Sequence, residues 1–287
     1  MKRRLTSAFF IGLISLFITA CGEDNLPEYI QLGGLRVLAL EVNAGGFSEV
    51  AAGSTVTVVP FISAIDFAGT ISYSAQACLD PGLGFGAEPS CVGVPGAVTL
   101  ASGAALALPG VANDWTGAAD SFNVNIPSSG VIFAGKSAQD QYNGVSYLVT
   151  YELQDSSGRQ VKSFRRIIVS TKSPKNQNPS SVTVLANGSA FISYPLSTSV
   201  DLSISISGVG AENFSEQLSD GSFRSRTEEI TTTWFISDGE MKFFRTLGGD
   251  VNQFTGPASL PTGRKAYVIA VTRDGRGGVV VTQQAFP

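Results

Sequence analysis

Hydrophobic and polar residues alternate with a period of two along most of this chain. In residues 200–206, for example, Val200, Leu202, Ile204 and Ile206 occupy every second position. Because successive side chains of a strand point to opposite faces, this pattern predicts strands with one buried face. We expect strands at 35–40, 54–62, 70–75, 145–153, 160–170, 182–184, 200–206, 231–236, 241–244, 266–271 and 279–281. One helical turn is expected around 137–143.

Turn-forming residues separate these segments and predict antiparallel hairpins. Asp155-Ser156-Ser157-Gly158 joins the strands at 145–153 and 160–170, and residues 273–278 join the last two strands. Asp238-Gly239 is expected to turn the strand at 231–236 back into 241–244. The chain is therefore predicted to be all-β and antiparallel.

A polar segment with two prolines, residues 173–180, divides the strand pattern into two halves. We interpret it as a linker with little to pack. The predicted domains are 35–172 and 181–287, each long enough to bury its own core.

The N-terminus has the pattern of an export signal. Three basic residues at 2–4 precede an uncharged run of 13 residues from Ala8 to Ala20, which is short for a membrane span of about 20. The run ends at Ile18-Thr19-Ala20-Cys21, which resembles the lipobox of bacterial lipoproteins. We expect residues 1–20 to be a signal peptide and 21–34 to be the lipidated cysteine with a flexible tether.

The lipobox resemblance implies a diacylglycerol thioether on Cys21 and acylation of its new amino group, so the membrane is the expected partner through this anchor. Gly22 follows the cysteine. By resemblance, the absence of Asp there favours the outer membrane, at either the periplasmic face or the cell surface.

Charge and composition narrow the function classes. Loss of three basic residues with the signal leaves 16 basic and 23 acidic residues, a net charge of −7, and residues 37–135 contain no Lys or Arg. A continuous basic surface for nucleic acid is therefore not expected. Histidine is absent, which excludes Ser-His-Asp, Cys-His and histidine-containing zinc sites, so we predict neither catalytic residues nor a cofactor.

Cys78 and Cys91 flank a Gly/Pro-rich segment. In an exported protein two such cysteines predict a disulfide. The alternative, two thiolates binding a soft metal, lacks further ligands.

Acidic residues offer no metal site in the sequence. They are spread singly and we place them in turns, at Asp66, Asp80, Asp114, Asp120, Asp220, Asp238 and Asp274. Calcium needs six to eight oxygens, usually from one loop, so turn formation is the preferred role. Carboxylate pairs for glycoside hydrolysis have no specific spacing here.

Trp115 is the aromatic residue expected to be most exposed and the candidate for ligand contact, because we place it in a loop region. A flat exposed ring could hold a sugar, as in carbohydrate-binding modules. The preferred alternative is that it closes the end of its own core.

Tyr147-Leu148-Val149 and Tyr267-Val268-Ile269 occupy corresponding places in the two halves, and each resembles the tyrosine corner of immunoglobulin-like sandwiches, with the aliphatic residue pointing inward. Trp234 corresponds to their buried tryptophan. The chain resembles exported lipoproteins with immunoglobulin-like or PKD-like modules, although residues 234–239 only approximate the PKD motif. The resemblance implies two tandem immunoglobulin-like antiparallel β-sandwiches.

These observations predict a non-enzymatic envelope lipoprotein whose domains bind a protein or polymer partner. The alternatives are a carbohydrate-binding surface adhesin that uses Trp115 and a purely structural spacer.

Overall fold

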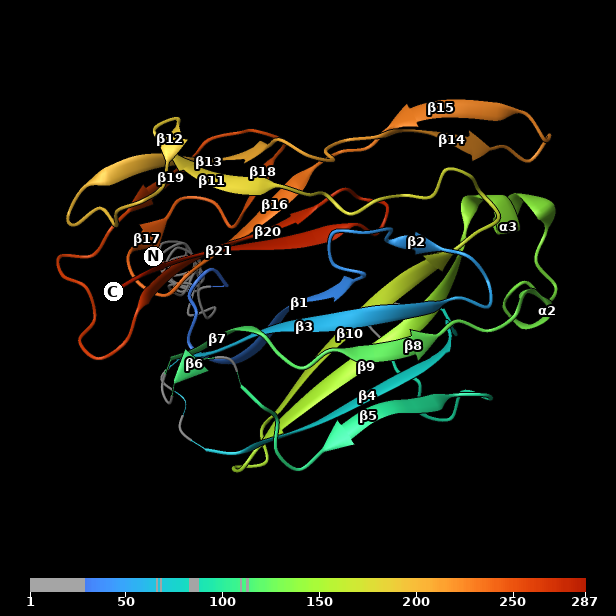
Figure 1. Cartoon of the computed structure of the whole chain (residues 1–287), viewed down its shortest axis with the longest axis horizontal. Helices are drawn as coiled ribbons and strands as arrows, with labels where there is room; N and C mark the ends of the chain where they lie inside the picture. Colours follow the sequence, from blue (N-terminus) through green and yellow to red (C-terminus); the bar gives the residue numbers. More distant parts are fainter. Residues whose placement is uncertain (1–28, 66, 68, 83–87, 109, 112–113) are drawn as a thin grey trace, which may run out of the picture.

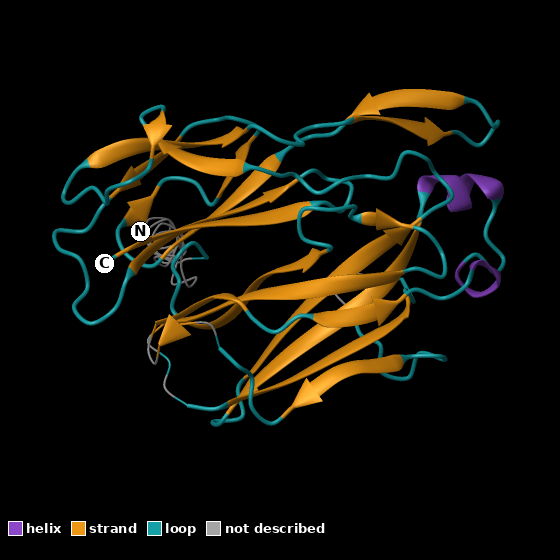
Figure 2. Ribbon diagram, viewed as in Figure 1, coloured by secondary structure: helices purple, strands orange, loops and turns teal. Residues whose placement is uncertain are grey.

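The computed structural model describes residues 29–287 except 66, 68, 83–87, 109, 112 and 113, so Cys21 and the predicted signal peptide lie outside the described residues. Strands dominate the described part (Figure 2), which confirms the all-β prediction. The two described helices are α2 (Ser129–Ile132) and α3 (Ala138–Asn143), and Ser137 caps the predicted helical turn. None of the described helices is long and apolar enough to cross a membrane.

The first half of the chain forms two sheets (Figure 1). One has the order β1-β3-β7-β6, with β8 also paired to β3, and the other has the order β2-β10-β9-β4-β5. The pairs are antiparallel except β2 with β10. The strands are β1 (Gly34–Val42), β2 (Glu49–Val50), β3 (Thr55–Ile65), β4 (Ile71–Leu79), β5 (Val98–Gly103), β6 (Gly110–Val111), β7 (Asp114–Ala118), β8 (Phe122–Asn125), β9 (Val145–Asp155) and β10 (Gln160–Val169).

A single apolar core lies between these two sheets. Val56, Val58 and Ile62 of β3 pack in it with Val149 and Ile167 of the other sheet. The predicted alternation along β9 is confirmed, because Tyr147, Val149, Tyr151 and Leu153 are all buried in this core. The first half is thus sandwich-like.

The second half forms two further antiparallel sheets and one hairpin. Their orders are β12-β11-β13-β19-β17 and β18-β16-β20-β21, and β14 pairs with β15. The strands are β11 (Val182–Ala186), β12 (Ser189–Ala190), β13 (Ser199–Ile206), β14 (Asn213–Gln217), β15 (Phe223–Thr227), β16 (Thr231–Ile236), β17 (Glu240–Met241), β18 (Arg245–Leu247), β19 (Asn252–Thr255), β20 (Ala266–Arg273) and β21 (Val279–Phe286). Trp234, Leu202 and Phe254 are fully buried in the core between the two sheets.

After Asp238-Gly239 the chain turns back to pair antiparallel with β16 as predicted, but the returning strand is β18 and not residues 241–244. β17 pairs with β19 in the other sheet, and Phe243 and Phe244 are half exposed. The chain thus pairs with the other sheet at Met241 and Lys242 before it returns to β16 at Phe244 and β18.

The inward orientation predicted for Ile269 is also wrong, and Tyr267 lies on the same face of β20. These two side chains pack with Leu38, Phe61 and Ile65 of the first half, in an apolar cluster that joins the halves. Val268 and Ala270, on the opposite face of β20, line the core of the second half. Both faces of β20 are therefore buried. Alternation alone does not tell which face lines the core of the second half and which face contacts the first half.

Part of the predicted tether is fixed to the second half. The N–H of Leu32 donates to the carbonyl of Ile236 at 2.6 Å, and the N–H of Ile236 donates to the carbonyl of Ile30 at 3.0 Å. Leu32 is buried in the joining cluster. The prediction of a flexible tether is wrong for residues 30–32, because backbone groups of β16 and apolar neighbours hold them.

Candidate functional site

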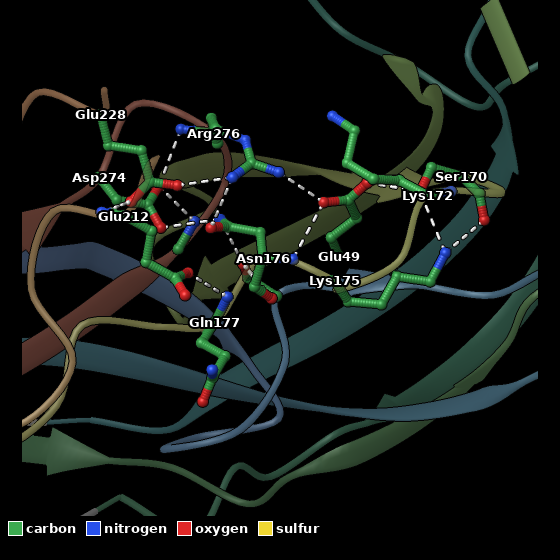
Figure 3. Close-up of polar contacts among 12 residues, drawn as sticks. Glu49, Ser170, Lys172, Lys175, Asn176, Gln177, Glu212, Glu228, Asp274 and Arg276 are labelled. Carbon is green, nitrogen blue, oxygen red and sulfur yellow. Dashed lines mark hydrogen bonds and ion pairs between the residues drawn. The ribbon is translucent and has the colours of Figure 1, made fainter. Parts of the chain in front are cut away.

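A buried polar cluster lies where the first half, the segment 173–180 and the last hairpin meet (Figure 3). Glu49 is 1% exposed, and its carboxylate accepts hydrogen bonds from Arg276 Nη2 at 2.7 Å and from the backbone N–H of Asn176 at 3.0 Å. Arg276 Nη1 donates to Glu228 Oε1 at 2.8 Å. One guanidinium from the second half therefore offsets two buried carboxylates, one from each half.

The segment 173–180 is part of this cluster, so the prediction that it packs little is wrong. Asn176 Nδ2 donates to Asp274 Oδ2 at 2.8 Å and to Ser48 Oγ at 2.9 Å. Asn178 Nδ2 donates to the carbonyl of Val42 at 2.7 Å, and its Oδ1 accepts from the N–H of Val279 at 2.9 Å. Both asparagines are buried because their amides satisfy polar groups of both halves.

The turn between β20 and β21 positions Arg276. Asp274 Oδ1 accepts from the N–H groups of Arg276 and Gly278, each at 2.8 Å. A Cβ at Gly278 would lie 1.9 Å from Asp274 Oδ2, so this close approach requires glycine. The predicted turn role of Asp274 is confirmed, and its second oxygen binds Asn176 in addition.

Glu228 is the cluster's most perturbed carboxyl group. Burial raises the pKa of Glu228 to about 7, with a smaller contribution from the charge of Asp274, while Arg276 and the backbone N–H of Glu212 favour the ionised form. The cluster therefore contains a group that titrates near neutral pH.

The β14–β15 hairpin reaches from the second half to α3 of the first half (Figure 1). Asn143 Nδ2 donates to the carbonyl of Gln217 at 2.8 Å, and Asn143 Oδ1 accepts from the N–H of Gln217 at 2.8 Å. The rings of Tyr142 and Phe223 meet edge to face with centroids 5.1 Å apart. The hairpin is thus a second connection between the halves.

A groove of about 520 Å³ lies between this hairpin, β10 and the 275–277 turn, which we call the junction groove. Phe214 forms part of its lining, with Arg276 Cζ 4.2 Å from the ring centroid. Lys172 lines the groove as well, and its Nζ lies 5.2 Å from the Tyr142 centroid and 5.5 Å from the Phe214 centroid. Burial lowers the pKa of Lys172.

Most cations of the junction groove have acidic partners. Arg166 pairs with Asp80 at 2.5 Å and Arg226 pairs with Glu216 at 3.2 Å, whereas Arg276 pairs with the two buried glutamates. Lys172 is only 6% exposed, yet its ammonium makes no ion pair or hydrogen bond with any residue that the structure describes. In Figure 3 its side chain extends away from the bonded cluster. Arg165 lines the groove as well, and its buried Nε has no hydrogen-bond partner among the described residues. The carboxylates of Glu49 and Glu216 act on Lys172 only from beyond ion-pair distance. The groove therefore offers cations without a directly bonded carboxylate to an acidic ligand.

The predicted disulfide is present, with Cys78 bonded to Cys91 at the end of β4. The two cysteines pack with Leu148 and Val94 in a small buried cluster of their own. Neither cysteine lines the junction groove, and the bridge closes the loop between them.

Trp115 lies in β7, opposite Ala64 of β3, and not in the predicted loop. The half-buried side chain packs against the first core, and its ring centroid lies 5.7 Å from that of Phe67. The small hollow beside it, lined by Ile71, Leu106 and Leu108, does not share residues with the junction groove. Sugar contact by Trp115 stays a prediction.

Asp114 differs from the turn assignment made for it. It begins β7, is buried, and accepts a hydrogen bond from the backbone N–H of Lys265 in the second half at 3.2 Å. Asp66 lies outside the described residues.

Within residues 29–287, less the gaps given above, no three Cys, Asp or Glu side chains come together to hold a metal ion.

The groove residues come from distant parts of the sequence, and analysis of the sequence missed them. Glu49, Lys172, Phe214 and Arg276 stand in no common motif, and the polar residues 176–178 belong to the segment predicted to be a linker with little to pack. One sequence feature pointed to this site, namely Arg276 between two glycines directly after Asp274. That pattern predicts a turn, but it does not predict which residues Arg276 binds. Comparison of the chain with protein-family models and with curated proteins found no match.

Proposed function

We propose that this chain is a non-enzymatic lipoprotein of the bacterial outer membrane, attached through Cys21, and that its junction groove binds an acidic group of a protein or polymer partner. Lipid attachment rests on Ile18-Thr19-Ala20-Cys21 after an uncharged apolar run. The binding role rests on one observation above all, the buried ammonium of Lys172, which forms no ion pair or hydrogen bond with a described residue.

A buried ammonium without a partner is costly, because the protein interior does not replace its hydration. The aromatic rings of Tyr142 and Phe214 offset part of this cost by cation–π attraction. A carboxylate that entered the groove would add an ion pair, in a setting that already excludes much of the water. An acidic ligand is therefore the class that the site favours.

The connections between the halves favour a binding role over that of a flexible spacer. The apolar cluster around Tyr267, the buried asparagines 176 and 178, and the β14–β15 hairpin all cross from one half to the other. A groove whose walls come from both halves keeps its shape only if the halves keep one position relative to each other. The contacts named above hold them in that position.

We further propose that each half is an immunoglobulin-like sandwich. Two sheets around a single core in each half support this, as does the full burial of Trp234, whose Nε1 donates to Thr246 Oγ1 at 2.9 Å. Tyr267 packs against the first half, so the tyrosine corner predicted for the second half gives this proposal no support.

Binding of poly-L-glutamate and of polygalacturonate, measured with the purified full chain, tests the proposed groove. We expect Lys172→Gln to weaken binding of the preferred polymer about tenfold, the loss of one charge-assisted contact. Lys162→Gln is the matched control, because it removes an exposed lysine of β10, the strand that precedes Lys172. This variant should bind like the wild type. Equal binding by the wild type and Lys172→Gln, or no binding of either polymer, would overturn the assignment.

A further inference from the structure

A second hollow, of about 300 Å³, opens at the edge of the junction between the halves, and we call it the arginine hollow. Arg36 of β1, Arg245 of β18 and Arg273 of β20 line it, together with the rings of Tyr29 and Phe235. None of its lining residues is acidic. Three cations from three strands therefore converge on one small space.

The three guanidiniums have only neutral partners among the described residues. Arg36 Nη1 donates to the carbonyl of Tyr29 at 2.9 Å, and Arg273 Nη1 donates to Thr233 Oγ1 at 3.2 Å. Arg245 Cζ lies 5.5 Å from the centroid of the Phe244 ring, its one contact of this kind. Burial lowers the pKa of Arg36 and of Arg273, and the charge of Arg245 lowers that of Arg273 further.

Such a group of like charges is unfavourable until an anion enters. Guanidinium groups bind phosphate and carboxylate oxygens with paired N–H donors, and Arg is the preferred residue for phosphate recognition. The mature chain has a net charge of −7, so the molecule as a whole is not attracted to an anionic surface. The positive charge of the hollow is a local feature. The hollow therefore has the charge and the donors that an anion site requires.

The position of the hollow along the chain indicates the source of that anion. Tyr29 lines the hollow and lies next to residues 30–32, which hydrogen bonds fix to β16. Tyr29 lies eight positions after Cys21, and an extended chain of that length spans at most about 28 Å. A lipid on Cys21 would hold the hollow within this distance of the bilayer.

Exposed aromatic side chains flank the hollow. Tyr29 is 64% exposed and Phe244 is 49% exposed, with ring centroids 6.1 Å apart. Tyrosine rings beside basic residues are common at the headgroup level of membranes, where the ring is half immersed and the cations face lipid phosphates. The arrangement thus matches a membrane surface in charge and in apolar contact.

We propose that the arginine hollow binds the phosphate group of an anionic phospholipid in the membrane that holds Cys21, and so fixes the orientation of the protein on the bilayer. This inference rests on the proposed lipid attachment. It concerns residues other than those of the junction groove, so either site can fail without the other.

Hydrogen exchange of the full chain in vesicles tests the proposal. The purified protein is reconstituted in phosphatidylcholine alone and in phosphatidylcholine with phosphatidylglycerol, and exchange is followed in residues 29–38. We expect slower exchange in the anionic vesicles. Arg245→Gln should remove the difference, whereas Arg224→Gln, which removes an exposed arginine of the β14–β15 hairpin, should retain it. Since Arg245 is exposed, its replacement leaves the fold intact, which thermal unfolding checks.

A titration of the detergent-solubilised chain with inorganic phosphate separates the two sources of the anion. We expect phosphate to bind and Arg245→Gln to weaken its binding about tenfold. Phosphate binding without slower exchange in anionic vesicles would assign the hollow to a soluble phosphate and overturn the lipid proposal. Absence of both effects overturns the site itself. Fatty-acid labelling of Cys21 reports on the anchor independently of both readouts.

Discussion

Arg276 Nη2 lies 2.7 Å from Glu49 Oε2, although 227 residues separate them in the sequence. The pair joins the last hairpin of the second half to a short strand of the first. Together with Glu228 and Asn176 it forms a continuous set of buried hydrogen bonds beside an apolar cluster that the halves share. The two halves are therefore expected to unfold together.

Replacement of Arg276 tests this connection. Arg276→Gln should lower the free energy of unfolding by about 3 kcal/mol, because it leaves the buried carboxylates of Glu49 and Glu228 without their counter-charge. Denaturation in urea measures the change. Arg224→Gln is the matched control, since its ion pair with Glu216 has the same 2.7 Å length but is exposed, and it should cost less than about 1 kcal/mol. Equal losses for the two variants would contradict a structural role for the buried pair.

The pH dependence of stability should reveal Glu228. Its pKa is raised from 4.5 in the unfolded chain to about 7 in the folded chain, so between these values the folded state holds a proton that the unfolded state has lost. Stability from this group is therefore present below pH 4.5 and is lost as the pH rises to 7. Unfolding free energies at pH 5 and pH 8 measure the effect.

Glu228→Gln removes the titrating group. Relative to the wild type, this variant should be more stable at pH 8 than at pH 5, whatever its absolute stability. Glu240→Gln, at an exposed position of β17, should show no such change. If the free energies of unfolding of the wild type and Glu228→Gln differ by the same amount at pH 5 and at pH 8, the raised pKa is refuted.

The disulfide should stabilise the first half through its loop. Cys78 and Cys91 are 13 positions apart, and closing a loop of about this length restricts the unfolded chain by about 3 kcal/mol. The double variant Cys78→Ser, Cys91→Ser should lose that amount in urea denaturation. Addition of a reductant should then destabilise the wild type and leave the double variant unchanged. A wild type insensitive to reductant under unfolding conditions would show that the bridge does not form.

Local pattern predicted the strands well, because alternation and turn residues act over a few positions. β9, β10, β13, β20 and β21 lie within a few residues of their predicted bounds, and the disulfide was found from its spacing and context. These features depend on neighbours in the sequence, so the sequence alone contains the needed information.

The errors concern which surfaces meet. Tyr267 and Val268 are both buried, one against the first half and one in its own core, and alternation cannot distinguish these two environments. Asn176 and Asn178 belong to the segment predicted to pack little, yet groups of both halves satisfy their amides. The groove was missed for the same reason, since Lys172 acquires its neighbours only when the halves come together.

Metabolic labelling with an alkyne fatty acid tests the lipid attachment on which the account depends. The wild type should incorporate the probe and fractionate with the outer membrane, and its mature N-terminus should be a modified Cys21. The Cys21→Ser variant should remain unlabelled. A wild type without label, or a label that persists in Cys21→Ser, would contradict an envelope protein anchored at this residue.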